Sequence, residues 1–394
     1  MWRTLQQDFS ASALMAALLA TLVSYSGPFL IMIHAAQSAH LSAQALSSWI
    51  WAVSVGAGVA GVYLSWRWKM PVITAWSTPG AAILLAALPH QVYAEAIGAY
   101  LVAAVLIMLI GASGVFDRLM RVFPPTLAAA MLAGILFRFV AELISALGEH
   151  AALILPMLVL FFIGRRRWPR YALACAIILG AALTLYMDPT FNSTTPLLGN
   201  GPHFVVPEWS VQAMLNVALP LTIVALSGQF LPGMAVLHHA GYTLEARSPV
   251  TTLGFLSLLT APFGGHGVTL AAITAAICTG PDAHPNPHRR YIAGVVSGGL
   301  YILIGVLGGY MVTWILSLPK AFIVAAAGLA LFSTLAASLE ATLRNETHRE
   351  AGLLTFMVAA SGVSWFGLGA PLWALLAGLG VMGLMQYRPR LQHI

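Results

Sequence analysis

The chain has 394 residues, of which 59% are hydrophobic and only 8% are Asp, Glu, Lys or Arg. Soluble proteins average about 45–50% apolar and about 25% charged residues, so this composition excludes a set of soluble domains and predicts an integral membrane protein. The formal net charge of +6 does not indicate a nucleic-acid surface, because the charges lie in short connectors rather than on one basic face.

Apolar runs follow one another along nearly the whole chain. A helix that crosses a bilayer needs roughly 20 apolar residues, and we cut the runs at charged, Pro and Gly clusters. The first run continues too far to be the hydrophobic region of a cleaved signal peptide. The fourteen predicted segments are 12–34, 45–66, 72–88, 92–115, 124–147, 151–164, 170–187, 212–239, 249–262, 267–280, 291–317, 321–343, 351–367 and 370–387.

The longest polar stretch, residues 188–210, is rich in Pro, Asn and Thr and predicts an extracytoplasmic linker between two halves, 1–187 and 211–394. With the N-terminus placed in the cytoplasm, sixteen of the eighteen Lys and Arg residues fall on the cytoplasmic side. Lys320 falls outside and Arg138 lies within a segment. Because basic residues favour the cytoplasmic side, both termini are predicted to be cytoplasmic.

Segments three and ten are short and interrupted. In segment three, residues 71–75 are predicted to be extended, and a helix is predicted to start at Trp76-Ser77-Thr78-Pro79, with Ser or Thr as cap and Pro in the first turn. Segment ten repeats the plan, with 267–270 extended and 271–279 helical. Interrupted segments at corresponding positions of two halves indicate a transporter binding site.

The two interrupted segments lie seven apart in the order of segments, so the second half would be inverted relative to the first. Residues 22–30 of segment one also align with 223–231 of segment eight, with five identities in nine. The predicted fold is therefore an all-α polytopic membrane protein. It has fourteen transmembrane segments in a seven-plus-seven inverted repeat, with segments three and ten each a short strand plus a half-helix.

Irregular backbone within a bilayer persists only when protein buries it or when it lines a cavity. The two interruptions therefore predict a cavity at which two half-helix N-termini meet. Their free N–H groups and positive dipole ends suit an anion, and a small carboxylate is the simplest ligand. The alternative is that Ser77, Thr78 and Thr274 only cap and kink ordinary helices.

Gln229 is a polar side chain within segment eight and precedes Pro232-Gly233. It either donates to a bound carboxylate or forms a hydrogen bond between helices. The aligned region of segment one offers an aromatic wall, although Phe in a membrane helix is more often a packing residue. The predicted substrate-binding residues are Tyr25, Ser26, Phe29, Trp76, Ser77, Thr78, Gly80, Gln229, Phe230, Ala271, Ile273 and Thr274.

A few titratable residues also lie within the segments. Arg138 and Glu142, four residues apart on one helix face, are either gating charges or a buried structural ion pair. His266 precedes the second half-helix and is placed for a proton-linked step, the alternative being a loop histidine without that role. Three further histidines nearer the segment ends are expected at the membrane interface, namely His34, His238 and His239.

The sequence contains no nucleophile and base arrangement, phosphate-binding loop, metal-ligand spacing or dinucleotide fingerprint. Cys175 and Cys278 lie in apolar runs without a CxxC or Cys/His spacing and are expected to be packing residues. We therefore expect neither an enzyme nor ATP hydrolysis within this chain, and no metal or cofactor. The energy source of a transporter would then be an ion gradient.

Three stretches resemble a known family. They are 71–80 (PVITAWSTPG), 124–136 (PPTLAAAMLAGIL) and 271–278 (AAITAAIC) followed by Asp-Ala-His-Pro at 282–285. Together they resemble the bacterial benzoate/proton symporter family, over essentially the whole chain. The resemblance implies proton-coupled uptake of benzoate or a related aromatic carboxylate across the bacterial inner membrane, without a cofactor.

The resemblance also implies the fold of uracil permeases and sulfate transporters. In that fold a core domain of segments 1–4 and 8–11 (about 12–115 and 212–317) moves like an elevator against a gate domain of segments 5–7 and 12–14 (about 124–187 and 319–387). A homodimer is compatible with this arrangement, and the oligomeric state is left open.

This chain departs from the family pattern at Phe230, where an Asn is expected after Gln229. The departure suggests a more apolar or differently shaped aromatic acid. Relatives often carry a carboxylate in segment eight or ten, and neither segment has one here, which leaves the proton carrier unassigned. The alternatives are a nucleobase or inorganic-anion permease of the same fold, or a passive anion channel. A nucleobase would normally require the missing carboxylate.

Overall fold

The structure is a computed structural model that describes residues 8–26, 28–122, 124–169, 171–187, 201–271, 273–316, 319–366 and 368–386. Residues 188–200 of the predicted linker and residue 387 of the last predicted segment lie outside this range. The described chain is mostly helical, as the composition and the apolar runs predict.

The N-terminal half consists of helices and one short strand. In chain order these are α2 (Ala11–Ser26), α3 (Pro28–Ser38), α4 (Ala43–Trp68), β1 (Thr74–Trp76), α5 (Thr78–Ala87), η1 (Leu88–His90), α6 (Tyr93–Ser113), α7 (Phe116–Val122), α8 (Pro125–Leu147), α9 (Ala151–Arg167) and α10 (Ala172–Met187).

The C-terminal half contains the second strand. Its elements are α11 (Val211–Ala213), η2 (Met214–Ala218), α12 (Leu219–Ala225), η3 (Leu226–Phe230), α13 (Leu231–His239), α14 (Arg247–Thr260), η4 (Ala261–Phe263), β2 (Val268–Leu270), α15 (Ile273–Thr279), η5 (Pro287–Arg289), α16 (Tyr291–Leu316), α17 (Lys320–Arg344), η6 (Glu346–His348), α18 (Arg349–Ser361) and α19 (Ala370–Gln386).

Seven helical stretches of the described chain are long and apolar enough to cross a membrane. They coincide with predicted segments one, two, four, five, eight, eleven and twelve. Three shorter apolar helical stretches, Thr78–His90, Ala172–Met187 and Ala370–Met385, coincide with segments three, seven and fourteen. The chain is therefore a membrane-type helical protein whose helices follow the predicted apolar runs.

One of the long runs is less regular than predicted. Segment eight contains two π-helical turns, η2 and η3, and Pro220 or Pro232 opens the α-helix after each. A proline removes one helical hydrogen bond, and π-turns inside helices are frequent at functional sites.

Two further predictions need correction. The helix of segment thirteen ends at Ser361 rather than near 367, because Gly362 adopts a left-handed conformation with φ of 68°. His34 is not interfacial but buried, with 4% of its surface exposed.

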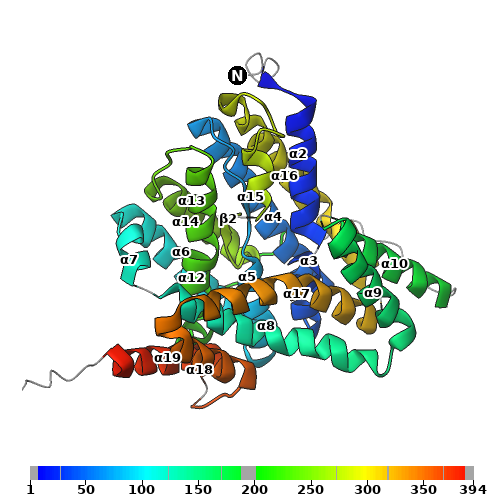
Figure 1. Cartoon of the computed structure of the whole chain (residues 1–394), viewed down its shortest axis with the longest axis vertical. Coiled ribbons are helices and arrows are strands. Elements are labelled where there is room, and N and C mark those ends of the chain that lie inside the picture. Colours follow the sequence, from blue (N-terminus) through cyan, green and yellow to red (C-terminus); the bar gives the residue numbers. More distant parts are fainter. Residues whose placement is uncertain are drawn as a thin grey trace, which may run out of the picture.

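Small residues bring the helices of the first layer close together. A Cβ added to Gly298 of α16 would lie 2.6 Å from the carbonyl oxygen of Gly58 in α4, and one added to Gly58 would lie 2.5 Å from that of Gly298. Helices in lipid associate through such close backbone contacts, since burial from water does not drive them together. The same layer holds α2, α6 and α14 beside this pair (Figure 1).

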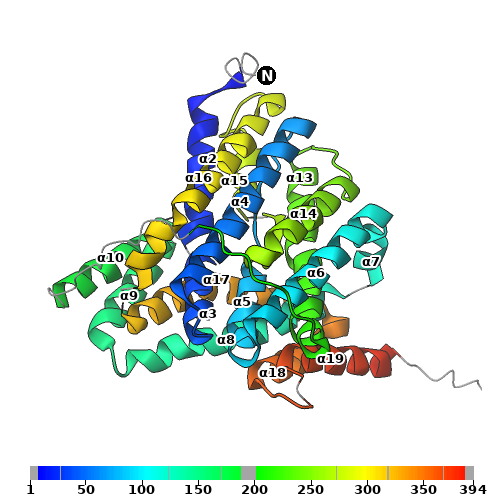
Figure 2. The ribbon, with the colours of Figure 1, turned by 180° about the vertical axis from the view of Figure 1, so that it is seen from behind.

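A second layer is built around α8 and α17, which pack against each other. Both views place α9 and α10 at one end of this pair and α18 and α19 at the other (Figures 1 and 2). The two layers meet mainly where α3 packs on α17 and α5 packs on α8.

The described end of the linker, residues 201–210, has no helix or strand and lies along the first layer. The Val205 N–H donates to the Pro262 carbonyl at 2.8 Å, and the Glu208 N–H donates to the Ala94 carbonyl at 3.0 Å. This end of the linker is therefore fixed against η4 and α6.

Candidate functional site

The two predicted interruptions meet in a two-stranded antiparallel sheet near the middle of the first layer. Thr74 pairs with Leu270, Ala75 with Thr269, and Trp76 with Val268. Since each strand leads directly into its half-helix, the N-termini of α5 and α15 flank the sheet at opposite ends. Strand and half-helix therefore follow in both places, as the sequence predicts.

Ser77 caps α5. Its Oγ accepts a hydrogen bond from the Gly80 N–H at 3.0 Å, and Pro79 occupies the first turn. The Ser77 N–H itself donates to the Gly267 carbonyl across the sheet at 3.2 Å. Because Pro79 has no N–H and that of Gly80 is used by the cap, the first-turn donor left for a ligand is the N–H of Thr78.

His266 joins α4 to the start of α5. The Trp49 indole Nε1–H donates to His266 Nδ1 at 2.8 Å, and His266 Nε2 lies 2.9 Å from the Ser77 carbonyl oxygen. An indole N–H can only donate and a carbonyl can only accept, so Nδ1 is deprotonated and Nε2 carries the proton. With 3% of its surface exposed, His266 is a neutral imidazole with both nitrogens in use.

An aromatic cluster lies beside β1. The Tyr25 ring packs edge-on against Trp76 with a centroid distance of 4.6 Å, and Tyr301 of α16 contacts both, at 5.0 Å from Tyr25 and 5.6 Å from Trp76. Phe29 adds a fourth ring, 6.1 Å from Tyr25. The Tyr25 hydroxyl donates to Ser54 Oγ at 2.8 Å, which fixes this ring.

The polar atom of the Trp76 side chain, unlike that of Tyr25, has no hydrogen-bond partner among the described residues. The Trp76 side chain is 2% exposed, and its indole Nε1 is fully buried. An unpaired buried donor costs about 1–3 kcal/mol. Such groups in native proteins call for a specific explanation, such as a ligand or an ordered water.

The start of α15 faces α2. The Ala271 N–H extends the strand pairing by donating to the Ile73 carbonyl at 2.9 Å. Ser24 Oγ donates to Thr274 Oγ1 at 3.5 Å, and both side chains are buried. Ile273 belongs to α15 and Ser26 to α2, and these two helices pack together, so these predicted residues belong to the same region of the fold.

Gln229 and Phe230 lie in the π-turn η3, which contacts β2. The Gln229 side chain is partly exposed, whereas Phe230 is fully buried. Where the family resemblance predicts an Asn, this chain thus has the buried ring of Phe230, while the amide of the neighbouring Gln229 stays partly exposed.

Arg138 and Glu142 do not join this site. Both side chains are exposed on α8, and the described chain shows no ion pair between them, so the buried ion pair expected from their spacing is not formed. The Arg138 guanidinium instead lies directly against Gly362, at the C-terminal end of α18. A cation there complements the negative end of the helix dipole.

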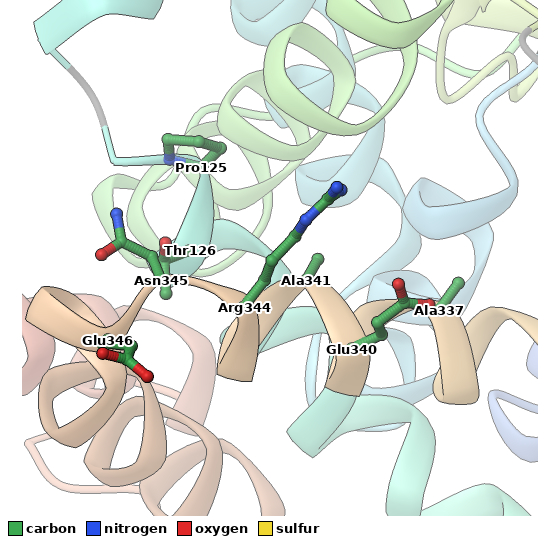
Figure 3. Close-up of a pocket in the computed structure, with 8 residues that line it drawn as sticks. All are labelled: Pro125, Thr126, Ala337, Glu340, Ala341, Arg344, Asn345 and Glu346. Carbon is green, nitrogen blue, oxygen red and sulfur yellow. The ribbon is translucent and has the colours of Figure 1, made fainter.

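A surface hollow of about 740 Å³ lies elsewhere, between the first turn of α8 and the end of α17. Figure 3 shows the lining residues, with the Arg344 and Glu346 side chains extending in different directions. The residues that line it are Pro125, Thr126, Ala337, Glu340, Ala341, Arg344, Asn345 and Glu346. None of them is a predicted binding residue.

The sequence reasoning missed three residues that shape the site. Tyr301 is a polar aromatic residue in an otherwise apolar run, which was its available signal. Trp49 gave no signal before its contact with His266 was known. Arg290, 8% exposed, donates to the carbonyls of Thr279, His284 and Pro285 at 2.7, 2.7 and 3.4 Å and so holds the C-terminal end of α15.

No group of three or more His, Cys, Asp or Glu side chains that could hold a metal ion occurs among the described residues.

The fold is similar to solved transporter structures. The transmembrane domain of a cyanobacterial bicarbonate transporter, BicA, matches with a TM-score of 0.61 at 13% identity, over 94% of this chain and 97% of that one. The anion transporter SLC26A9 also matches, with a TM-score of 0.61 at 14% identity over 95% of this chain and 66% of that one.

Comparison of the sequence with known proteins identifies the family more specifically than comparison of the fold does. The "benzoate membrane transport protein" of Acinetobacter baylyi (strain ATCC 33305 / BD413 / ADP1) is 42% identical over 377 residues, 96% of each chain. The "inner membrane protein YdcO" of Escherichia coli (strain K12) is 38% identical over 365 residues, 93% of each chain. These relatives are named as membrane proteins rather than enzymes. Since the family model for benzoate membrane transport proteins matches residues 7–384, the chain belongs to that family.

Proposed function

We propose that this chain is a secondary active transporter that carries benzoate or a related aromatic carboxylate into the cell together with a proton. Membership of the family and a relative named as a benzoate transport protein support this substrate class. The absence of a phosphate-binding loop from the sequence favours an ion gradient as the energy source.

The observation that carries the proposal is the unpartnered indole N–H of Trp76 at the end of β1, one residue before the cap of α5. A carboxylate bound there would accept from this N–H and from the N–H of Thr78, at the positive end of a helix. The partly exposed amide of Gln229 would orient the anion from η3, which contacts β2. The two N–H groups and the positive end of the α5 dipole would thus replace the hydrogen bonds to water that the carboxylate of benzoate loses on binding.

The ring of the substrate also has a complementary surface. Tyr25 presents an aromatic side chain next to Trp76, held by its bond to Ser54. Aromatic pairs at centroid distances of 4.5–7 Å add roughly 0.5–1.5 kcal/mol beyond burial. An inorganic anion would gain nothing from such a wall, so the cluster favours an aromatic acid.

The proposed mechanism is an elevator movement of a core against a gate, within fourteen segments arranged as two inverted repeats. The core would comprise about 12–115 and 212–317, and the gate about 124–187 and 319–387. The packing supports this division, because α4 pairs with α16 in one layer and α8 pairs with α17 in the other. The half-helices would move with the core and carry the substrate across.

In this proposal the protein lies in the bacterial inner membrane with both termini in the cytoplasm. The distribution of basic residues supports that orientation. A homodimer would brace the two gates so that each core moves independently.

The substitution Trp76→Phe tests the binding site. It keeps the ring and removes the N–H, and a hydrogen bond to a charged group is worth roughly 1.5–3 kcal/mol, so we expect benzoate to bind at least about tenfold more weakly in isothermal titration calorimetry. The smaller ring leaves a void beside Tyr25 and Tyr301, so the melting temperature should fall somewhat, but the loss of the N–H itself breaks no hydrogen bond among the described residues.

The matched control is Trp51→Phe, which removes an indole N–H from a partly exposed tryptophan of α4 that packs edge-on against Phe263. Its affinity for benzoate should equal that of the wild type. Unchanged affinity in Trp76→Phe, or a loss of stability without a loss of affinity, would contradict this site.

A further inference from the structure

His34 is a buried titratable group that the proposed binding site does not use. It lies in α3, with 4% of its surface exposed, and its Nδ1 is fully buried without a hydrogen-bond partner among the described residues. His266, in contrast, has both ring nitrogens bonded. Among the described residues, His34 is therefore the buried histidine with a ring nitrogen that no hydrogen bond occupies.

His34 lies where the two layers meet. Its ring packs edge-on against Phe139 of α8 at a centroid distance of 6.3 Å, and α3 also packs on α17. Burial of the ring has the largest effect on the imidazole, and the Glu142 carboxylate of α8 and the Lys320 ammonium of α17 act on it with opposite sign. The contact thus places a buried imidazole against an aromatic ring of the other layer, which also carries a negative and a positive charge that act on it.

The remaining elements packed on α3 contribute little charge. Neither α2 nor α5 contains Asp, Glu, Lys, Arg or His. The short η1 contributes His90, which is exposed, and α8 also carries Arg138, which is directed to Gly362. Glu142 and Lys320 are therefore the charged residues that act on His34, in addition to the burial of its ring.

Other carriers are less suitable within the described chain. No Asp or Glu is among its buried residues. Its buried Tyr and Cys groups have ordinary pKa values near 10 and 8.5, so they hold their protons throughout the neutral range. Histidine is the side chain whose charge ordinarily changes between pH 5 and 8.

We propose that His34 binds the transported proton, an inference that rests on the proposed function of proton-coupled uptake. The imidazole would take up a proton at Nδ1, with the Glu142 carboxylate stabilising the resulting charge. Sliding of α3 past α8 and α17 would then change its distance from Glu142 and Lys320. A different proton affinity in the two positions is what coupling requires, because only differential binding shifts a two-state equilibrium.

The test uses the full-length protein in proteoliposomes and two measurements. Accumulation of radiolabelled benzoate under an imposed inward proton gradient requires coupling, whereas benzoate exchange at equal pH on both sides requires only binding and movement. For His34→Gln we expect at least a tenfold loss of gradient-driven accumulation, with exchange within twofold of the wild type. The control His40→Asn, an exposed residue with φ of 52° that Asn tolerates, should retain both.

Normal gradient-driven accumulation by His34→Gln would overturn the assignment of the proton to His34. If His34→Gln does not fold, the Glu142→Gln variant tests the proposal instead, because the Glu142 side chain is exposed. Removing the negative charge makes the charged imidazole harder to form, so we expect the decline of uptake with rising pH to begin at a lower pH. An unchanged pH profile would overturn the proposal. Failure of proton coupling itself would be seen in the wild type, as exchange without proton flux.

Discussion

The two half-helices follow the same plan of strand, interruption and helix, yet they are fixed at opposite ends. In α5 the N-terminal end is held by the Ser77 cap and by the chain of bonds through His266 to Trp49. In α15 the C-terminal end is held by Arg290, which donates to three carbonyl groups. The two half-helices therefore follow the same order of strand and helix but are held by different side-chain contacts.

The charges of the two anchors differ as well. The α5 anchor is a neutral imidazole, so it leaves the positive end of the helix dipole available to an anion. The α15 anchor is a buried cation at the negative end of its helix, where it complements the dipole and leaves the opposite end uncharged. Both arrangements keep fixed cations away from the place where a carboxylate is proposed to bind.

Loss of the α15 anchor should have the largest effect. Arg290→Gln removes a buried guanidinium and leaves carbonyl groups without their charged donors, each worth roughly 1.5–3 kcal/mol. We expect about 3 kcal/mol or more of destabilisation, measured by thermal unfolding in detergent. Arg290→Lys should recover only part of this stability, since one ammonium cannot reproduce the geometry of the guanidinium. Equal stability of the glutamine variant and the wild type would refute the anchor.

Loss of the α5 anchor should cost less. His266→Ala removes two neutral hydrogen bonds and leaves the buried Trp49 N–H unpaired, a loss of roughly 1–3 kcal/mol, while the Ser77 carbonyl keeps its bond from the Ala81 N–H at 2.9 Å. His266→Gln can accept from Trp49 and donate to Ser77, so it should recover most of the stability.

The same glutamine variant tests the alternative role of His266 in proton coupling. Since the imidazole is fixed in its neutral form by both bonds, the pH profile of benzoate uptake should not change. A shifted profile in His266→Gln would make this residue, rather than His34, part of the proton pathway.

A smaller change at the same anchor is Gly80→Ala. A Cβ at Gly80 would lie 2.8 Å from Ser77 Oγ and 3.1 Å from His266 Cδ2, so it presses on the cap itself. Overpacking of this kind costs roughly 1–3 kcal/mol. We expect a lower melting temperature together with weaker benzoate binding, and an unchanged melting temperature would show that the cap can move aside.

The smallest expected effect is that of Gln229→Ala. The partly exposed amide adds one orienting bond, and a typical hydrogen bond contributes about 0.5–1.5 kcal/mol, so benzoate should bind a few-fold more weakly with unchanged folded yield. Asn at this position should retain part of the affinity. If the alanine variant binds as tightly as the wild type, Gln229 is a packing residue.

Local signals predicted much of this architecture. The stretch Ser77-Thr78-Pro79 correctly predicted a capped helix start, because capping depends on residues three apart. The extended chain at 268–270 was likewise readable from its own residues. The anchors were not readable, since His266 is separated from Ser77 by 189 positions and from Trp49 by 217.

Spacing also misled in one place. An ion pair was one of the two interpretations of the i, i+4 arrangement of Arg138 and Glu142, but the guanidinium lies against the end of α18, which is distant in sequence. His34 was placed at the interface because it lies near the end of an apolar run, although α8 covers it through Phe139. Contacts with other helices therefore decide the environment of titratable groups that a single helix leaves exposed.

The central claim is tested most directly by uptake of radiolabelled benzoate into proteoliposomes, with and without an imposed inward proton gradient, in the presence of uracil, sulfate or bicarbonate as competitors. We predict accumulation that depends on the gradient and is blocked by unlabelled aromatic carboxylates alone. Equilibration without accumulation would indicate a passive channel. Competition by uracil or by an inorganic anion would show that the proposed cargo is wrong.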